Sequence, residues 1–288
     1  MFTGMPEGGA SERVRAVLAG TRFADIRWVS TTGSTNADVL ALARDGAPEG
    51  VVVVADHQSA GRGRRDRRWV APPGASLLVS VLLRPPSRVA GGVTLAAGVA
   101  LAEAVEQVAG VQAGLKWPND LVASSGDQER KLAGILAEAD WPTGTTMSGG
   151  YRPPAPGDRV VVVVGVGINV TWPRDLSGEA AEVAEVATAL NWLGPEVDRA
   201  DLLVAFLQAF AARYATLVAD GPATILDAWR ARSATLGRRV RVDLGRDDVE
   251  GTAVDVTDDG HLVVQTLEGD RRTITVGDVV HLRPVGDP

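Results

Sequence analysis

Two lysines are the first candidates for chemistry in this sequence. Of the 29 lysines and arginines in the 288-residue chain, only Lys116 and Lys131 are lysines. Arginine is a rigid planar fork that keeps its proton, whereas lysine carries a compact, mobile charge with three donors. A site that must place one ammonium group between two anions would therefore accept lysine and reject arginine. The alternative is chance survival of two ordinary lysines, one of which precedes an apolar run typical of a buried strand.

A loop rich in arginine and glycine is the second candidate. Five arginines fall within positions 62–68, with Gly61 before them, Gly63 among them and Trp69 after them. Guanidinium groups suit phosphate and carboxylate, and glycine lets a ligand approach the backbone closely. A solvated face or a nucleic-acid patch is the alternative. The position of the loop after a buried strand favours a small anion, and we expect the loop to become ordered only with its ligand.

Composition excludes several other kinds of site. The chain has no cysteine, which removes disulfides and thiolate catalysis, and its three scattered histidines (His57, His261 and His281) do not predict a metal cluster. No serine nucleophile motif, phosphate-binding P-loop or dinucleotide glycine pattern is present. A net charge of −7 argues against general nucleic-acid binding. With no signal peptide and no eighteen-residue apolar stretch, we expect a soluble cytoplasmic protein with no membrane partner.

The remaining groups suit the joining of a carboxylate to a nucleotide phosphate. Both reactants are anions and repel each other. A lysine and several arginines between them would offset that repulsion and stabilise the charge that develops on the α-phosphate. Because an acyl adenylate hydrolyses readily, a loop that closes over it is also expected.

Strands must position most of these groups. Apolar, β-branched or alternating runs predict strands at 23–30, 50–55, 75–83, 114–122, 132–138 and 160–170, with a hairpin loop at 123–130. Helical spacing predicts helices at 11–20, 37–46, 89–111, 179–193, 198–219 and 223–236. From Arg238, apolar and polar residues alternate between turn signals and predict four or five short strands.

These elements divide the chain into a short N-terminal segment (1–22), a catalytic domain (23–236) and a small β-barrel (237–288). The first segment is too short for a helix-turn-helix head. A Gly- and Pro-rich stretch at 139–158 predicts a long surface connection. In the strand at 160–170, Gly165 and Gly167 would let either a ligand or a helix lie against the sheet.

Five motifs together resemble the biotin protein ligase (biotin–[acetyl-CoA carboxylase] ligase) family. They are Ser34-Thr-Asn36, Gly61-Arg-Gly-Arg-Arg-x-Arg-x-Trp69, Lys116-Trp-Pro-Asn-Asp120, Arg130-Lys-Leu-Ala-Gly-Ile135 and Gly165-x-Gly-Ile-Asn169. The resemblance covers about residues 25–285 in the family's order and spacing. It implies an α+β fold, in which a mixed sheet with helices is related to the class II aminoacyl-tRNA synthetases, and a small C-terminal Src-homology-3-like β-barrel. It also implies that biotin and ATP form biotinyl-5′-AMP, from which a lysine of a biotin carboxyl carrier domain takes the biotin.

The resemblance also implies site residues. For biotin they are Ser34, Thr35, Asn36, Gln58, Gly61, Arg62, Gly63, Arg64, Lys131, Gly134 and Gly165. For ATP they are Arg67, Trp69, Lys116, Asn119 and Asn169. The catalytic residues that it implies are Lys131, Arg64 and Asp120. Lys131 bridges the biotin carboxylate and the α-phosphate, and Asp120 lies where the carrier lysine loses its proton. Magnesium is expected to arrive on the ATP phosphates rather than on protein ligands. Without a DNA-binding head, the chain resembles the non-repressor group and no DNA partner is expected; a weak homodimer stays open.

One departure from the family pattern concerns Asp66, which stands where the family usually has glycine in the closing loop. A carboxylate there adds negative charge near the adenylate and removes backbone freedom, so we hypothesise that Asp66 loosens adenylate retention. Three alternatives remain: a lipoate ligase, a non-catalytic biotin or nucleotide sensor, and a nucleic-acid binder that uses the arginines of 62–68.

Overall fold

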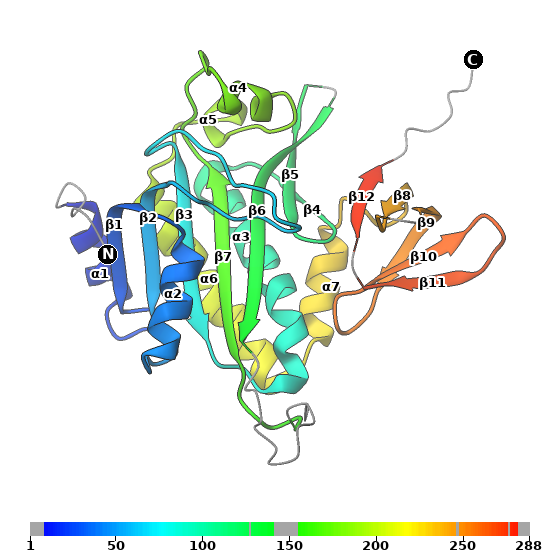
Figure 1. The fold of residues 1–288 in the computed structure, drawn as a ribbon, viewed down its shortest axis with the longest axis horizontal. Helices are drawn as coiled ribbons and strands as arrows, with labels where there is room; N and C mark the ends of the chain where they lie inside the picture. The colour runs from blue at the N-terminus through cyan, green and yellow to red at the C-terminus, as the bar shows by residue number, and fades with distance from the viewer. Residues whose placement is uncertain (1–8, 127, 141–154, 246–247, 276, 282–288) are drawn as a thin grey trace.

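The computed structural model describes residues 9–126, 128–140, 155–245, 248–275 and 277–281. They form a large α+β unit and a smaller β unit at one side of it (Figure 1). The predicted connection at 139–158 lies mostly outside the described residues. The domain boundary expected after residue 236 falls between the last helix of the large unit and the first strand of the small one.

A seven-stranded mixed sheet forms the centre of the large unit. In spatial order its strands are β1 (Ile26–Thr32), β2 (Val52–Gln58), β3 (Ser76–Leu83), β7 (Val161–Asn169), β6 (Gln128–Asp140), β5 (Asp120–Ser125) and β4 (Gly114–Lys116). Only β1 and β2 are parallel, and every other neighbouring pair is antiparallel. The central strands are continuous Val- and Leu-rich runs because both faces of the sheet are covered.

Helices cover the two faces unequally. On one face lie α1 (Ala10–Leu18), the 3-10 helix η1 (Ser87–Gly92), α3 (Val93–Ala109), α6 (Arg199–Asp220) and α7 (Ala223–Ala231). On the other face α2 (Thr35–Arg44) packs alone over β2, β3 and β7. That single helix leaves room beside it for the loop between β2 and β3, which crosses in front of the sheet toward the small unit (Figure 1).

Two helical segments meet the length and hydropathy expected of a membrane span, contrary to the expectation of no such stretch: 87–109 and 199–220. Both belong to the core. Helices α3 and α6 pack against each other, and residues such as Val99, Leu101, Phe206 and Phe210 are fully buried. Their apolar character is that of helices packed in a protein core.

The small unit is an antiparallel sheet of five strands. They are β8 (Arg239–Asp243), β9 (Asp248–Val256), β10 (Leu262–Thr266), β11 (Arg271–Ile274) and β12 (Asp278–His281). Their order is β11-β10-β9-β8-β12. The predicted fold class, a mixed α+β domain followed by a small β domain, is confirmed.

Three predicted regions differ from the structure. In the first, 114–130, the strand expected at 114–122 is two antiparallel strands, β4 and β5. The hairpin loop is shorter than 123–130, because β5 continues to Ser125 and β6 begins at Gln128. The helix expected at 179–193 is two short helices, α4 (Glu179–Ala184) and α5 (Leu190–Leu193). Between them the backbone of Val186 and Thr188 bonds to the backbone of Lys131, at 3.0 and 2.8 Å, instead of continuing a helix.

The third difference is α7, which ends at Ala231 rather than 236. Beyond it the backbone of Arg232 and Ala234 exchanges hydrogen bonds with Leu115, at 2.8 and 2.9 Å. The chain therefore leaves the helix to cover the outer edge of β4. In both cases a long-range backbone pairing overrides a local helical pattern.

A histidine at the junction of the two units gives an expected pH dependence. His281 Nδ1 lies 3.2 Å from Glu129 Oε2, and its Nε2 lies 3.4 Å from Thr235 Oγ1. Burial, reinforced by the charges of Lys116 and Arg238, lowers the pKa of His281 from 6.5 to about 4. The unfolded chain thus binds a proton that the folded chain does not, and stability falls as the pH drops from about 7 toward 4.

Below about pH 7, we expect His281→Gln to reduce the slope of the free energy of unfolding against pH. The reduction is at most roughly 1.4 kcal/mol per pH unit, the maximum for one proton. Urea unfolding of both proteins between pH 7 and 4 measures the effect. Parallel stability curves for the two proteins would show that His281 does not set the slope.

Candidate active site

A polar cavity of about 240 Å³ lies beside α2, between the sheet, the arginine loop and the small unit. It brings together most residues predicted for the site. These are Ser34, Thr35, Asn36, Gln58, Arg62, Gly63, Arg64, Arg67, Trp69, Lys116, Asn119, Asp120, Lys131, Gly134 and Gly165. They come from five separate segments of the chain, so a single cavity joins motifs that the sequence spreads over more than a hundred positions.

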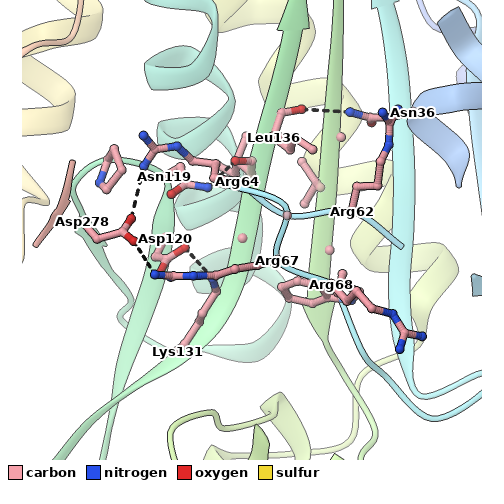
Figure 2. Close-up of a pocket in the computed structure, with 18 of the residues that line it drawn as sticks. Asn36, Arg62, Arg64, Arg67, Arg68, Asn119, Asp120, Lys131, Leu136 and Asp278 are labelled. Atoms are coloured by element: carbon pink, nitrogen blue, oxygen red, sulfur yellow. Dashed lines mark hydrogen bonds and ion pairs between the residues drawn. The ribbon is translucent and has the colours of Figure 1, made fainter. Parts of the chain in front are cut away.

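Lys131 points its amine into this cavity. Nζ lies 2.7 Å from Asp120 Oδ1 on the neighbouring strand β5 and 5.8 Å from the centroid of the Trp69 ring. Side chains of the arginine loop and of the Ser34–Asn36 turn line the same space (Figure 2). The ammonium group therefore faces other charged groups at the cavity, as a role between two anions requires, although 36% of the Lys131 side chain is exposed.

The turn before α2 is held by a buried polar network. The backbone N–H and the hydroxyl of Thr35 both donate to Gln58 Oε1, at 2.8 and 3.1 Å. Asn36 Nδ2 donates to the carbonyl of Leu136 at 3.2 Å and to Glu138 Oε2 at 2.7 Å. Ser34 stands at the helix N-cap, but its side chain makes no capping hydrogen bond. Capping alone therefore does not explain these three polar residues.

The two glycines of β7 make room for protein side chains. A Cβ on Gly165 would lie 2.1 Å from Asn36 Oδ1, and one on Gly167 would lie 2.6 Å from the Trp69 ring. Of the two explanations offered by the sequence, close packing of a helix residue accounts for Gly165, because Asn36 belongs to α2. The glycines thus seat Asn36 and Trp69 as walls of the cavity.

The arginine loop folds back on itself. Gly63 N–H donates to the carbonyl of Arg67 at 2.6 Å, and Trp69 N–H donates to that of Gly61 at 3.0 Å. At the tip, Arg65 and Asp66 have φ values of 53° and 58°, in the left-handed region. In this conformation Arg64 and Arg67 extend over one end of the cavity and Arg62 over the other (Figure 2).

Two carboxylates that the sequence interpretation did not single out hold the loop. Glu138 of β6 accepts from Arg62 at 3.0 Å, and Asp278 of β12 accepts from Arg67. Burial and the neighbouring Arg65 and Arg67 lower the pKa of Arg64, whereas the charges of Asp278 and Asp120 act in the opposite direction. Glu138 could have been suspected as a carboxylate at the end of an apolar strand. No local signal marks Asp278.

Two predicted site residues lie outside the cavity lining. Asn169 is buried with its amide donating to the carbonyl of Thr188 at 2.9 Å and its oxygen facing the Ser76 hydroxyl at 3.3 Å. Gly61 lies at the base of the loop, where a Cβ would meet the Trp69 backbone at 2.7 Å. Both residues contact other parts of the protein and not the cavity: Asn169 contacts Thr188 and Ser76, and Gly61 packs against Trp69.

The chemistry of the cavity follows from its charges. Lys116, Lys131, Arg64 and Arg67 line it together with the carboxylates of Asp120 and Asp278, so it is rich in cations. Trp69 Nε1 is buried without a hydrogen-bond partner among the described residues. Such a surface can hold two anionic groups side by side.

Comparisons with known proteins agree with this geometry. The sequence model of the Biotin/lipoate A/B protein ligase family matches residues 29–146, and that of the Biotin protein ligase C terminal domain matches residues 235–282. The biotin–[acetyl-CoA-carboxylase] ligase of Mycobacterium tuberculosis is 38% identical over 282 residues, 95% of each chain. A bifunctional ligase/repressor of Bacillus subtilis is 34% identical over 82% of this chain and 68% of its own.

Among solved structures, the biotin protein ligase of Aquifex aeolicus in complex with biotin and ATP superposes with a TM-score of 0.70. It is 25% identical and covers 91% of this chain and all of that one. The family models, the sequence identity to known ligases and the shared fold agree with the arrangement of the cavity, and the chain belongs to the biotin protein ligase family.

Proposed function

We propose that this protein is an ATP-dependent biotin–[acetyl-CoA-carboxylase] ligase. It joins the biotin carboxylate to the α-phosphate of ATP, releases pyrophosphate, and then transfers biotin from biotinyl-5′-AMP to one lysine of a biotin carboxyl carrier domain. The single observation that carries the proposal is the amine of Lys131, which lies in a cation-rich cavity between the arginine loop and the Ser34–Asn36 turn. The family relationship supplies the identity of the two substrates.

Within this cavity, biotin is assigned to the end formed by the Ser34–Asn36 turn, Gln58, Gly134 and Gly165. Gln58 accepts two hydrogen bonds from Thr35 through its amide oxygen, so its amide nitrogen stays available as a donor. ATP is assigned to the end formed by Lys116, Asn119, Arg67 and Trp69, where the cations suit its phosphates. Lys131 lies where the two ends meet and would bridge the reacting carboxylate and phosphate.

Asp120 has two roles in this proposal. Its ion pair with Lys131, at 2.7 Å, holds the amine in place before the substrates arrive. Once the adenylate has formed, the same carboxylate lies beside the acyl carbon and can accept the proton of the incoming carrier lysine.

Magnesium is assigned to the ATP phosphates and not to protein ligands. Among the described residues no group of three or more histidine, aspartate or glutamate side chains is placed to hold a metal ion. The residues present fit a metal that arrives with its nucleotide, because Lys116, Arg64 and Arg67 in the cavity lining favour phosphate oxygens over a bare cation. The cytoplasm, where ATP and the carboxylases occur, is the proposed location.

Biotin-dependent exchange of labelled pyrophosphate into ATP tests the first half-reaction. The purified full chain should catalyse exchange with biotin and not with lipoate, which separates this activity from lipoate ligation. Addition of a carrier domain should then give a product heavier by one biotinyl group in mass spectrometry. Biotin binding without exchange would instead indicate a sensor, and would refute the proposal.

The geometry at Asp66 yields a prediction about adenylate retention. Asp66 adopts a left-handed conformation, which costs non-glycine residues roughly 1 kcal/mol or more, and it lines an open groove shared with Leu136 and Glu138 of β6 rather than the cavity. Backbone strain is therefore a stronger reason than charge for it to loosen the closed loop. We expect Asp66→Gly to slow biotinyl-AMP release about fivefold, the equivalent of ~1 kcal/mol.

Stopped-flow chase of bound labelled adenylate measures this rate. Asp66→Asn is the matched control, because asparagine removes the charge but keeps a similar preference for the left-handed region. If Asn slows release as much as Gly does, charge is the cause; if neither changes it, Asp66 has no part in retention.

A further inference from the structure

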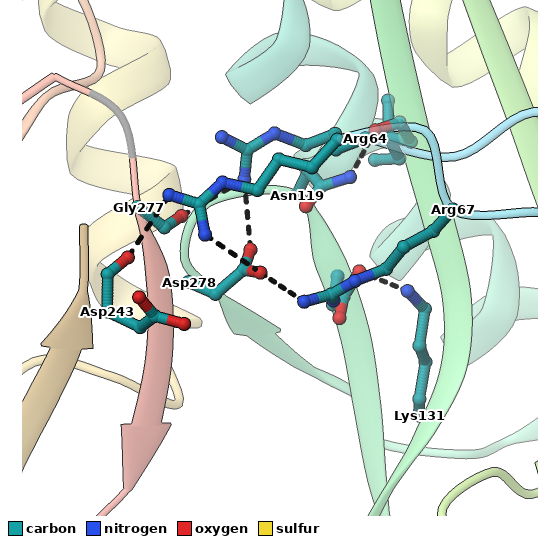
Figure 3. A network of polar contacts seen from close by, with 10 residues as sticks. Arg64, Arg67, Asn119, Lys131, Asp243, Gly277 and Asp278 are labelled. Atoms are coloured by element: carbon teal, nitrogen blue, oxygen red, sulfur yellow. Dashed lines mark hydrogen bonds and ion pairs between the residues drawn. The ribbon is translucent and has the colours of Figure 1, made fainter. Parts of the chain in front are cut away.

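The tip of the arginine loop is held by the small C-terminal unit, a contact that the proposed reaction does not itself require. Three guanidinium groups from the loop converge on the single carboxylate of Asp278 (Figure 3). Arg67 pairs with Oδ2, Arg65 Nη1 lies 3.5 Å from Oδ2, and Arg64 Nη1 lies 3.7 Å from Oδ1. The carboxylate side chain is only 21% exposed.

Backbone groups of the same unit complete this contact. Arg64 donates to the carbonyl of Gly277 at 3.3 Å, and Arg65 donates to the carbonyl of Asp243 at 3.2 Å. Asp243 is the register partner of Asp278 across β8 and β12. The edge formed by these two strands thus acts as a receptor for the loop, with Asp278 as its only side-chain anion that contacts the arginines among the described residues.

The charges explain why one carboxylate matters here. Three guanidinium groups brought this close repel one another, and Asp278 offsets that repulsion at its centre. It neutralises one of the three positive charges and occupies few of their fifteen or so N–H groups, since each guanidinium carries about five. Two charges and most donors stay available for an anion inside the cavity, so the contact with Asp278 and binding of an anionic ligand are compatible.

Within the part of the chain that the structure describes, two other ion pairs anchor arginines of the loop. Arg62 pairs with Glu138 of β6 at 3.0 Å, and Arg68 pairs with Glu179 at 3.3 Å in an exposed contact. Both lie at the base of the loop, whereas Arg64 to Arg67 form its tip. Loss of Asp278 would therefore free the part of the loop that extends over the reacting groups.

We propose that Asp278 is a positioning residue through which the C-terminal unit holds the arginine loop closed and so sets how long the acyl adenylate stays bound. This inference rests on the proposed function for its ligand, whereas the contact itself is made by residues of this chain. Closure here means that Asp278 keeps the loop tip over the cavity, while Arg64 and Arg67 contact the adenylate with their remaining donors.

The test compares release of labelled biotinyl-AMP from the full chain and from Asp278→Asn during a chase with unlabelled biotin. We expect the variant to release adenylate about tenfold faster, which corresponds to ~1.4 kcal/mol of lost interaction. Asp278→Glu should restore slow release.

Asp243→Asn is the matched control. Its carboxylate lies one strand away and accepts from the Gly245 N–H at 2.7 Å, and it makes no side-chain contact with the loop in the described residues. The same charge is removed from the same edge, so the variant should release adenylate as slowly as the unmodified protein. Unchanged or slower release from Asp278→Asn, or equally fast release from Asp243→Asn, would overturn the proposal.

Limited trypsin digestion without ligands separates this inference from the proposed function. Cleavage after the arginines of 62–68 should be several-fold faster in Asp278→Asn than in the unmodified chain or in Asp243→Asn. Equal cleavage of all three would overturn the loop contact whatever the activity. If the unmodified chain shows no exchange activity but the difference in cleavage persists, the ligase proposal fails and the role of Asp278 in holding the loop stands.

Discussion

Replacement of Lys131 by alanine should abolish biotin-dependent pyrophosphate exchange, with a fall in kcat/KM of about 10³-fold or more. One preorganised donor at a developing charge contributes roughly 10²–10³-fold, and a full ammonium group between two anions contributes more. The amine is already in place, 2.7 Å from Asp120 Oδ1 and beside the Trp69 ring. Biotin binding measured by calorimetry should weaken less than exchange, because the lysine acts mainly once both anions are present.

Two further variants test why this position is lysine in a chain of arginines. Lys131→Met keeps the apolar stem and removes the charge, and should be as inactive as alanine. Lys131→Arg keeps the charge but needs more room. Space beside the amine is limited, because even a Cβ added to Gly134 would lie 3.3 Å from Nζ. It should recover little activity. Substantial exchange by the methionine variant would rule out an essential ammonium group.

The two-residue alternation of the C-terminal strands and the Val-rich runs of the sheet were predictable from the sequence because both patterns are local. Each strand buries one or both faces, and the spacing of apolar residues shows which. The motifs of the cavity were also visible, since Lys131 and the loop at 61–69 consist of residue types that a core would not accept. The fold class followed from these local patterns and from the family resemblance.

The errors arose where distant backbone segments pair. The segment 179–193 has helical spacing, yet its helix ends in a turn at Val186, because Val186 and Thr188 pair with the backbone of Lys131. Asp278 could not be identified for the same reason: its partners in the loop are 211 and 213 positions away, and nothing in its neighbourhood distinguishes it from other surface acids. Local patterns specify elements, whereas contacts across the sheet and between units decide which polar groups meet.

The second large effect is expected at Gly165, in the middle of β7. Its register partners are Ser80 on β3 and Leu136 on β6. Those two residues also hold Asn36, through the Ser80 hydroxyl at 2.6 Å from Oδ1 and the Leu136 carbonyl at 3.2 Å from Nδ2. The Asn36 amide therefore lies directly over Gly165 and is anchored to the strands on either side of it.

Gly165→Ala would place a Cβ 2.1 Å from Asn36 Oδ1, a separation that no contact can sustain. Because Asn36 is anchored to Ser80, Leu136 and Glu138, it must give up hydrogen bonds worth about 1 kcal/mol each, and overpacking adds roughly 1–3 kcal/mol. We expect biotin affinity to fall about 100-fold or more in calorimetry, with a lower unfolding midpoint in urea. Gly157→Ala, which would meet no atom within 4 Å, should change neither.

The double variant Asn36→Ala/Gly165→Ala separates steric conflict from any other role of the glycine. Removal of the Asn36 amide makes space for the new methyl group, so the double variant should be more stable to urea than Gly165→Ala alone. Biotin affinity should stay low, because Asn36 also shapes the end of the cavity assigned to biotin. If the double variant were no more stable than the single one, the clash with Asn36 would not be the reason that this strand carries glycine at its centre.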